Sequence, residues 1–376
     1  MDESGSDDVL RLVVERVDSQ VSLIRAAAVC RRWRRAIADA VFLRRYRSLH
    51  APAIAGYYRN VKDRYPRVSP VFAPSPPPVV DARRFSLDFL PGGAASWTIR
   101  DSRGSLLVLC RANCSTKIVV CEPLTRRYKW IPPPTGLDDD SFSTRSYLID
   151  GEADETDSCI GMSNFRVVCM FNHCRDDDML VSMYTLGLSW SEKKINHIAP
   201  SFEESPSFEE LHLMGHGGDC WYFVQGRALI ILDGRTGDFS SSELPPLVED
   251  WDSHASESNF FITNGRDGKL RIFTVFDGTM KVFLRLEGGE WMLEKRVLLS
   301  EATRAVPGYD PSFFSNPQVV LMVGTGYVIL APSEDPWKFS MNLETMEAAP
   351  AVESLTSEVY GCELPWPPTY HACLDG

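Results

Sequence analysis

Long apolar stretches are absent from this sequence of 376 residues, and so are paired cysteines at metal-binding spacing. No run approaches the roughly 18 consecutive apolar residues of a membrane-spanning helix, so we expect no membrane partner. The first 20 residues are acidic and the apolar run at 12–14 is interrupted by charge, unlike a secretory signal. The ten scattered cysteines therefore predict reduced thiols and a cytoplasmic or nuclear protein.

The signatures of common catalytic sites are also missing. No phosphate-binding loop or dinucleotide fingerprint follows a strand into a helix. The stretch 187–191 lacks the final glycine of a nucleophile elbow. His212 and His216 stand four residues apart without the glutamate of a helical zinc site, and the glycines that follow favour a turn. These gaps predict a protein that is not an enzyme, with no cofactor and no metal.

Positive charge is scarce overall, with a formal net charge of −12, and it is unevenly spread. Residues 1–50 hold ten Arg against seven acidic residues, a net +3, so the remainder carries −15. An acidic body argues against broad nucleic-acid binding, because phosphate contacts need clustered Lys and Arg. The Arg cluster at 31–35 can be interpreted as a nucleic-acid patch or nuclear signal, but a solvated helix face, or one that meets an acidic partner, is the simpler interpretation.

The first pattern that is present is helical. Between residues 22 and 46 apolar residues recur mostly in steps of three and four, which predicts consecutive short helices with a break at Asp39. Upstream, six apolar residues cover about 200° of a helix face, twice the stripe of an ordinary surface helix. They are Val9, Leu10, Leu12, Val13, Val14 and Val17. We call the helical segment 1–50 the head. We expect its surplus apolar surface to be buried by one partner within the chain and one outside it. The alternative is that the head packs only onto the rest of the chain.

The head carries four motifs in a fixed order. They are Asp8-Val9-Leu10, Ser22-Leu23-Ile24-Arg25, Val29-Cys30-Arg31-Arg32-Trp33-Arg34 and Phe42-Leu43. This order resembles an F-box, the helical module by which substrate receptors dock onto the Skp-type adaptor of cullin ubiquitin ligases. The resemblance implies an adaptor-binding set made of Val9, Leu10, Leu23, Val29, Cys30 and Trp33. F-boxes usually begin with Leu-Pro, whereas Gly5 and Ser6 stand at those positions here.

After residue 80 the sequence consists of short β-like runs that repeat. Strand starts led by glycine occur at positions 104, 161, 218, 268 and 326, at intervals of 57, 57, 50 and 58 residues. Three turns share a polar residue that is followed three positions later by Thr. Side-chain oxygens at these positions can bond nearby backbone amides and fix a tight turn. The pairs are Glu122/Thr125, Asp233/Thr236 and Asn342/Thr345. Such a period with several strands per unit predicts a β-propeller, and an earlier, weaker unit at 56–88 brings the count to about six four-stranded blades.

The predicted fold class is therefore α+β and multidomain. We expect a small all-α F-box domain at 1–50, a proline-rich connecting segment at 51–80 that can begin the first blade, and an all-β propeller at 81–376. Pro66, Pro70, Pro74 and the run 76–78 exclude a central strand or helix interior and predict a surface loop. The acidic runs 138–140 and 176–178 are predicted to be solvated loops. Trp and Cys residues in the β runs, such as Trp97, Trp130, Trp190, Trp221, Trp291, Cys110, Cys114 and Cys121, are predicted to be core residues.

The β part has landmarks of its own. They include Val120-Cys121-Glu122-Pro123-Leu124-Thr125, Leu232-Asp233 with Thr236-Gly237, Asp267-Gly268-Lys269-Leu270 and the terminal Glu363-Leu364-Pro365-Trp366-Pro367-Pro368. They resemble the F-box-associated, Kelch-like propellers abundant in grasses, and they do not resemble WD repeats. Together the two resemblances imply a substrate receptor that binds a Skp-type adaptor, and through it cullin, and presents an unidentified target protein. Two alternatives remain open: a propeller interaction module whose F-box no longer docks the adaptor, and a propeller enzyme.

Overall fold

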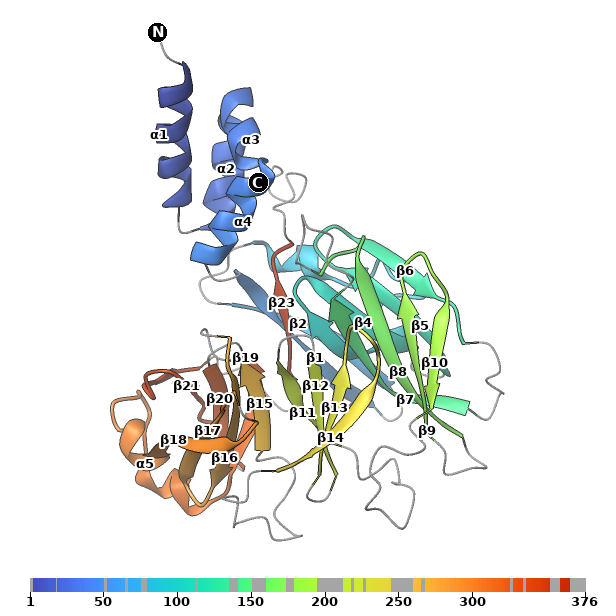
Figure 1. Cartoon of the computed structure of the whole chain (residues 1–376), viewed down its shortest axis with the longest axis vertical. Helices are drawn as coiled ribbons and strands as arrows, with labels where there is room; N and C mark the ends of the chain where they lie inside the picture. The colour runs from blue at the N-terminus through green and yellow to red at the C-terminus, as the bar shows by residue number, and fades with distance from the viewer. Residues whose placement is uncertain are drawn as a thin grey trace. The chain divides into compact units, whose positions relative to one another are not determined.

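The computed structural model describes residues 3–17, 19–50, 53–64, 67–75, 80–111, 114–134, 141–150, 160–173, 179–194, 212–217, 220–225, 228–244, 260–264, 268–287, 289–324, 327–333, 336–351 and 359–365. Strands predominate, in several sheets, with a few helices near the start of the chain (Figure 1). The chain falls into two compact units. Unit 1 comprises 1–169, 184–190 and 360–376, and unit 2 comprises 170–183 and 191–359.

Unit 1 opens with the four helices of the head. They are α1 (Glu3–Glu15), α2 (Gln20–Val29), α3 (Arg31–Ile37) and α4 (Ala40–Leu49). The short helices predicted between residues 22 and 46 are thus confirmed. Asp39 lies at the predicted break and caps α4, because its Oδ1 accepts a hydrogen bond of 3.0 Å from the backbone N of Phe42. Ser19 caps α2 in the same way, accepting from the backbone N of Ser22 at 3.3 Å.

The head has a small hydrophobic core of its own. Its buried members are Leu10, Val14, Leu23, Ala27, Ile37, Phe42 and Tyr46. Polar contacts join α4 to the end of α1: the Tyr46 hydroxyl donates to the backbone O of Val17 at 2.6 Å, and Nε2 of His50 lies 2.7 Å from the backbone O of Glu15. The guanidinium of Arg45 also contacts the Glu15 carboxylate, at 2.9 Å. Apolar packing and these contacts hold the four helices as one bundle.

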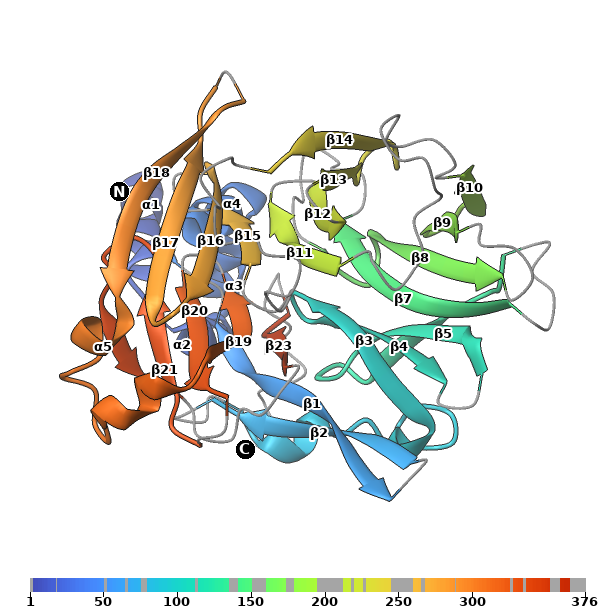
Figure 2. The ribbon, with the colours of Figure 1, turned by 90° about the horizontal axis from the view of Figure 1, so that it is seen from below.

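Three sheets begin in unit 1. The first has the order β2-β1-β23, the second is an antiparallel sheet with the order β3-β4-β5-β6, and the third has the order β10-β9-β8-β7. Figure 2 shows β3, β4 and β5 as neighbouring ribbons. Their bounds are β1 (Ile54–Arg64), β2 (Arg67–Pro74), β23 (Val359–Glu363), β3 (Trp97–Arg103), β4 (Leu106–Arg111), β5 (Cys114–Glu122), β6 (Arg127–Ile131), β7 (Ser141–Asp150), β8 (Phe165–His173), β9 (Met179–Thr185) and β10 (Trp190–Lys194). Two short 3-10 helices, η1 (Ala82–Phe85) and η2 (Ala94–Ser96), precede β3.

The proline-rich segment departs from its predicted loop. Residues 67–74 form β2, at the outer edge of the first sheet and paired with β1. Pro70 and Pro74 fit there because an edge strand has one side with no backbone partner, so the missing N–H is tolerated. The exclusion of a central strand therefore holds, and the prediction of a loop is wrong for these eight residues. Pro66, the run 76–78 and the acidic runs 138–140 and 176–178 lie outside the described residues.

Polar side chains connect the first strands of successive sheets in unit 1. The amide of Asn60 on β1 bonds both backbone groups of Ile99 on β3, donating to its O at 2.8 Å and accepting from its N at 3.0 Å. In the next step along the chain, Oδ2 of Asp101 on β3 accepts from the backbone N of Leu148 on β7 at 2.8 Å. These side chains satisfy backbone groups of the neighbouring sheet's first strand and so join successive sheets.

Unit 2 repeats the four-stranded arrangement three times. Antiparallel sets β11–β14 and β15–β18 join through a parallel contact between β11 and β15, and β19–β22 form a separate sheet. The bounds are β11 (His212–Gly217), β12 (Cys220–Gln225), β13 (Ala228–Asp233), β14 (Phe239–Glu243), β15 (Phe260–Asn264), β16 (Leu270–Phe276), β17 (Thr279–Arg285), β18 (Trp291–Leu298), α5 (Leu299–Ala302), η5 (Pro311–Ser315), β19 (Gln318–Gly324), β20 (Tyr327–Pro332), β21 (Phe339–Asn342) and β22 (Ala348–Pro350). The junction brings Gly215 of β11 against Ile262 of β15. Any side chain at this position would clash, because a Cβ there would lie only 2.1 Å from the backbone O of Ile262.

The three predicted polar-x-x-Thr turns each connect the third and fourth strands of a four-stranded set. Oδ1 of Asp233 accepts from the backbone N of Arg235 at 2.7 Å and of Thr236 at 3.3 Å. Oδ1 of Asn342 accepts from the equivalent amides of Glu344 at 2.8 Å and Thr345 at 3.0 Å. The predicted chemistry is thus confirmed in two turns.

The first turn differs in its partners. The carboxylate of Glu122 accepts from two hydroxyls, Oγ1 of Thr125 and Oγ of Ser105, the latter at 2.8 Å. The prediction that this side chain bonds backbone amides is therefore not met, although the turn forms at the predicted place. A glutamate has one more methylene than Asp or Asn, which carries its carboxylate past the nearest amides.

Replacing Asn342 by Ala should lower the free energy of unfolding by about 1 kcal/mol, because two turn amides lose their acceptor. Asn342→Asp keeps an oxygen at the same place and should stay close to the parent. Urea unfolding midpoints of the two variants check this. Equal midpoints for both would mean that water replaces the side chain at no cost.

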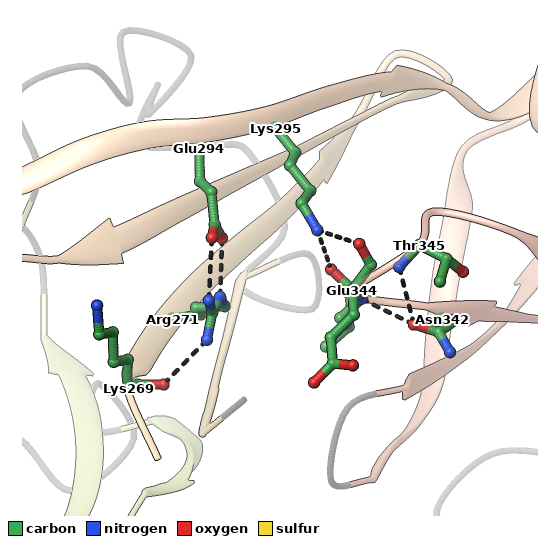
Figure 3. Close-up of polar contacts among 8 residues, drawn as sticks. Lys269, Arg271, Glu294, Lys295, Asn342, Glu344 and Thr345 are labelled. Atoms are coloured by element: carbon green, nitrogen blue, oxygen red, sulfur yellow. Dashed lines mark hydrogen bonds and ion pairs between the residues drawn. The ribbon is translucent and has the colours of Figure 1, made fainter. Parts of the chain in front are cut away.

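Charged side chains connect further strands of unit 2 (Figure 3). The guanidinium of Arg271 on β16 makes two bonds with the Glu294 carboxylate on β18, at 2.7 and 2.9 Å, and donates to the backbone O of Lys269 at 3.4 Å. The ammonium of Lys295 reaches the turn after β21, where it donates to the backbone O of Leu343 at 3.1 Å and to that of Glu344. These contacts join β18 to its own sheet and to the turn after β21.

The aromatic and sulfur residues divide between core and surface. Trp97, Trp221, Cys110 and Cys121 are buried, as predicted. Trp190 and Trp291 are partly exposed, and Trp130 is 40% exposed, so the prediction of core packing is wrong for Trp130. The side chain of Cys114 lies outside the described ones.

Candidate docking surface on the helical head

Helix α1 presents apolar side chains on two adjoining faces. One face carries Leu10 and Val14, 8% and 0% exposed, which pack into the head core. The other carries Val9, Leu12 and Val13, which are 60%, 54% and 51% exposed. At 100° per residue these three lie within an arc of about 100°. We call Val9, Leu12 and Val13 the α1 stripe. The surplus apolar surface predicted for this helix is therefore exposed.

Helix α2 supplies the contact between the head and the β strands of unit 1. The side-chain Nε2 of Gln20 donates to the backbone O of Pro365, just beyond β23, at 2.9 Å. Val21 belongs to the buried cluster that contains Ala55 of β1 and Cys362 of β23. The head thus packs onto β strands of unit 1, and it does so through α2. This contact leaves the α1 stripe at the surface.

The predicted adaptor-binding residues separate into surface and core positions. Val9 and Val29 are 60% and 70% exposed, and Cys30, the residue between α2 and α3, is also exposed. Trp33 is half-buried against the head core. Leu10 and Leu23 are buried in that core, so they position the helices and present no side chain to a partner. For these two residues the structure assigns a packing role where the resemblance implied direct contact.

The predicted set omitted other exposed apolar residues. Leu12 and Val13 complete the α1 stripe, and Val41 and Leu49 on α4 are 61% and 60% exposed. The helical period had already placed Leu12 and Val13 on an apolar face, and that signal was enough to find them. No pattern in the sequence separated the exposed face of α1 from the buried one, because both consist of Leu and Val.

Positive charge accompanies the apolar surface of the head. Arg31, Arg32, Arg34 and Arg35 are all exposed along α3, and Nε of Arg34 donates to the backbone O of Ala27 at 3.4 Å. Arg25 on α2 is exposed as well. The apolar stripe on α1 and the exposed arginines on α2 and α3 suit a partner that offers apolar pockets and acidic side chains.

Three cysteine thiols of the described part of the chain are buried and shifted in pKa. Burial raises the pKa of the thiols of Cys121, Cys169 and Cys362, which keeps them protonated and unreactive. The imidazole of His216 is exposed and lies 6.2 Å from the ring of Trp221. Among the described residues no three His, Cys, Asp or Glu side chains cluster as metal ligands. None of the described helices is long and apolar enough to cross a membrane.

No protein-family model matches this chain, and no curated protein matches it. Among solved structures, apo AztD from Citrobacter koseri is similar with a TM-score of 0.39 at 11% identity, over 81% of this chain and 88% of AztD. A protein from Lactobacillus plantarum gives a TM-score of 0.33 at 12% identity, over 81% and 84% of the two chains. The extracellular domain of a two-component system protein from B. thetaiotaomicron gives 0.34 at 9% identity; 69% of this chain spans 28% of that one. Likeness at this level carries no conclusion about function.

Proposed function

We propose that this chain is a substrate-receptor subunit of a Skp–cullin–F-box ubiquitin ligase, in which the helical head docks the adaptor. The observation that carries the proposal is the α1 stripe, Val9, Leu12 and Val13, which is exposed on a bundle that has a packed core of its own and exposes further apolar residues at Val29, Val41 and Leu49. A stripe of this kind on a helix that begins an F-box-like sequence is suited to burial by a partner. The receptor performs no bond chemistry and acts by raising the concentration of a target near the ubiquitin-loaded enzyme.

We further propose that the β strands form a propeller of about six blades. Five sets of four strands support this count, together with the sheet β2-β1-β23. That sheet pairs strands from early in the chain with its last described strand, which is the arrangement that closes a ring of blades. Loops between strands would then carry the target-binding surface.

Co-purification of the full chain with a Skp-type adaptor tests the proposal. Leu12→Glu/Val13→Glu should reduce capture about tenfold or more, because two charges replace apolar contacts while glutamate remains a good helix former. Leu188→Glu is the matched control, since Leu188 is an exposed apolar residue of the β part, 72% exposed. Its capture should equal that of the parent chain. Equal capture by the double variant would contradict docking through the α1 stripe.

A second candidate is a propeller interaction module whose head no longer docks the adaptor. Gly5 and Ser6 favour it, because they stand in the first turn of α1 where F-boxes usually hold Leu-Pro. No capture by the parent chain, with capture restored by Gly5→Leu/Ser6→Pro, would support this candidate. Proline is tolerated best at the first position of a helix, so this variant should start α1 about one turn later and keep the rest of it.

A further inference from the structure

Strand β6 is exposed along most of its length. It is an outer strand of the sheet β3-β4-β5-β6, and among the described strands its only pairing partner is β5. Four consecutive residues, 127–130, are exposed, and only Ile131 at the end of the strand is buried. An outer strand carries backbone N–H and C=O groups that another strand can pair with.

The two faces of β6 differ in chemistry. Because side chains alternate along a strand, Arg127 and Lys129 lie on one face and Tyr128 and Trp130 on the other. Trp130 is 40% exposed and its ring meets the buried Trp97 edge-on, with centroids 5.5 Å apart. Tyr128, also 40% exposed, lies 6.4 Å from the ring of Phe89. One face is therefore basic, and the other is an aromatic row that continues inward to the core.

The basic face is a local exception in an acidic chain. Three of the four residues 126–129 are cationic. The third is Arg126, in the turn before β6, whose guanidinium lies 5.3 Å from the ring centre of Phe89, the neighbour of Tyr128 in the aromatic row. The net charge of the whole chain is −12. The acidic residue paired with Arg127 across the sheet is Glu122, which is buried and bonded to Ser105 and Thr125. The β6 edge thus presents positive charge beside aromatic surface.

Lysine on an outer strand commonly serves only to discourage pairing with other chains. Charge alone would account for Arg127 and Lys129. It does not account for Tyr128 and Trp130, because exposed aromatic rings on the same strand favour association. Cationic and aromatic side chains in strict alternation are complementary to one kind of partner: a strand in which acidic and apolar residues alternate.

We propose that β6 is a docking edge for an extended acidic peptide of a partner protein. The peptide adds as a further strand beside β6, so that its acidic side chains face Arg127 and Lys129 and its apolar side chains cover Tyr128 and Trp130. Hydrogen bonds between the main chains of the peptide and β6 supply part of the affinity. The alternation of cationic and aromatic side chains on β6 supplies the specificity. This proposal concerns target binding and is independent of adaptor docking, so either can fail without the other.

The test uses the full chain and a fluorescein-labelled peptide of about nine residues that alternates Glu and Val. Binding is followed by fluorescence anisotropy at low and high salt. Arg127→Glu/Lys129→Glu should weaken binding about tenfold or more, and high salt should weaken binding to the parent chain. Arg296→Glu is the matched control, because Arg296 is an exposed arginine on β18, an outer strand of another sheet. That variant should bind as the parent does.

Two further peptides separate edge pairing from simple charge attraction. A version with Lys in place of Glu should not bind, and a version with Pro in place of Val, which lacks the amide donors, should bind about tenfold more weakly or not at all. Hydrogen exchange at residues 127–131 should slow when the Glu-Val peptide is added. The proposal is overturned if the parent chain does not bind that peptide, if the charge-reversed variant binds equally, or if the proline peptide binds as well.

Discussion

Replacing Glu294 by alanine should lower the free energy of unfolding by about 3 kcal/mol, because it leaves a buried guanidinium without its carboxylate. The Arg271 side chain is 9% exposed and that of Glu294 is 21% exposed. Two parallel bonds of 2.7 and 2.9 Å between them are lost in the variant (Figure 3). Charge-assisted bidentate pairs are among the stronger polar contacts in proteins. Urea unfolding of the full chain, followed by tryptophan fluorescence, gives the measurement.

A double variant distinguishes a buried unpaired charge from a mere loss of packing. Arg271→Met/Glu294→Met removes both charges and keeps apolar volume, so it should be more stable than Glu294→Ala alone. Arg83→Ala serves as a second control, because the Arg83–Asp81 pair is largely solvated, and its unfolding midpoint should equal that of the parent. If the double variant is as unstable as the single one, the cost lies in packing.

Sequence periodicity predicted the local structure well where its physical cause was local. The break at Asp39 and the turns at Asp233 and Asn342 could be predicted because each depends on a side chain that bonds amides two or three residues away. The four-stranded sets followed from repeated spacing of strand and turn signals. Edge strand β2 does not follow from the sequence, because its prolines predict a loop, although the unpaired side of an edge strand accepts proline.

The candidate docking surface was less predictable, because exposure is a property of tertiary packing. Val9 and Leu10 are neighbours with similar side chains, yet one is 60% exposed and the other 8%. The pattern of α1 indicated more apolar surface than one packing partner buries. Which face of α1 stays exposed depends on where α3 and α4 pack against it. The β6 edge was missed for a related reason. The recurrence of Trp in the β runs predicts a core position for Trp130, and only the fold places it on an outer strand.

The carboxyl of Asp101 has an environment that couples stability to pH. Burial is the main cause that raises its pKa from 3.8 to about 6, and hydrogen bonds from the backbone N of Leu148 and of Ser102 partly offset the shift. Because the folded-state pKa lies above the unfolded one, folding favours the protonated form. The stability that Asp101 contributes is therefore fully present below about pH 4 and is lost as the pH rises through about 6. Above that pH a partly buried carboxylate opposes folding.

Asp101→Asn should consequently stabilise the protein at about pH 7.5 by about 2 kcal/mol and lose this advantage toward about pH 4.5. The amide oxygen can still accept from Leu148, at 2.8 Å in the parent, while the buried charge is gone. Asp81→Asn is a control in which the pKa shift has the opposite sign. The hydrogen bond with Arg83 lowers the pKa of the exposed Asp81 carboxyl to about 2, so replacing this carboxylate by a neutral amide should not stabilise the protein. Unfolding midpoints at several pH values decide the matter. A loss of stability at pH 7.5 would show that the hydrogen bond to Leu148 outweighs the cost of burying the charge. An Asp101→Asn advantage that stays constant from pH 4.5 to 7.5 would show that folding does not raise the pKa of the Asp101 carboxyl.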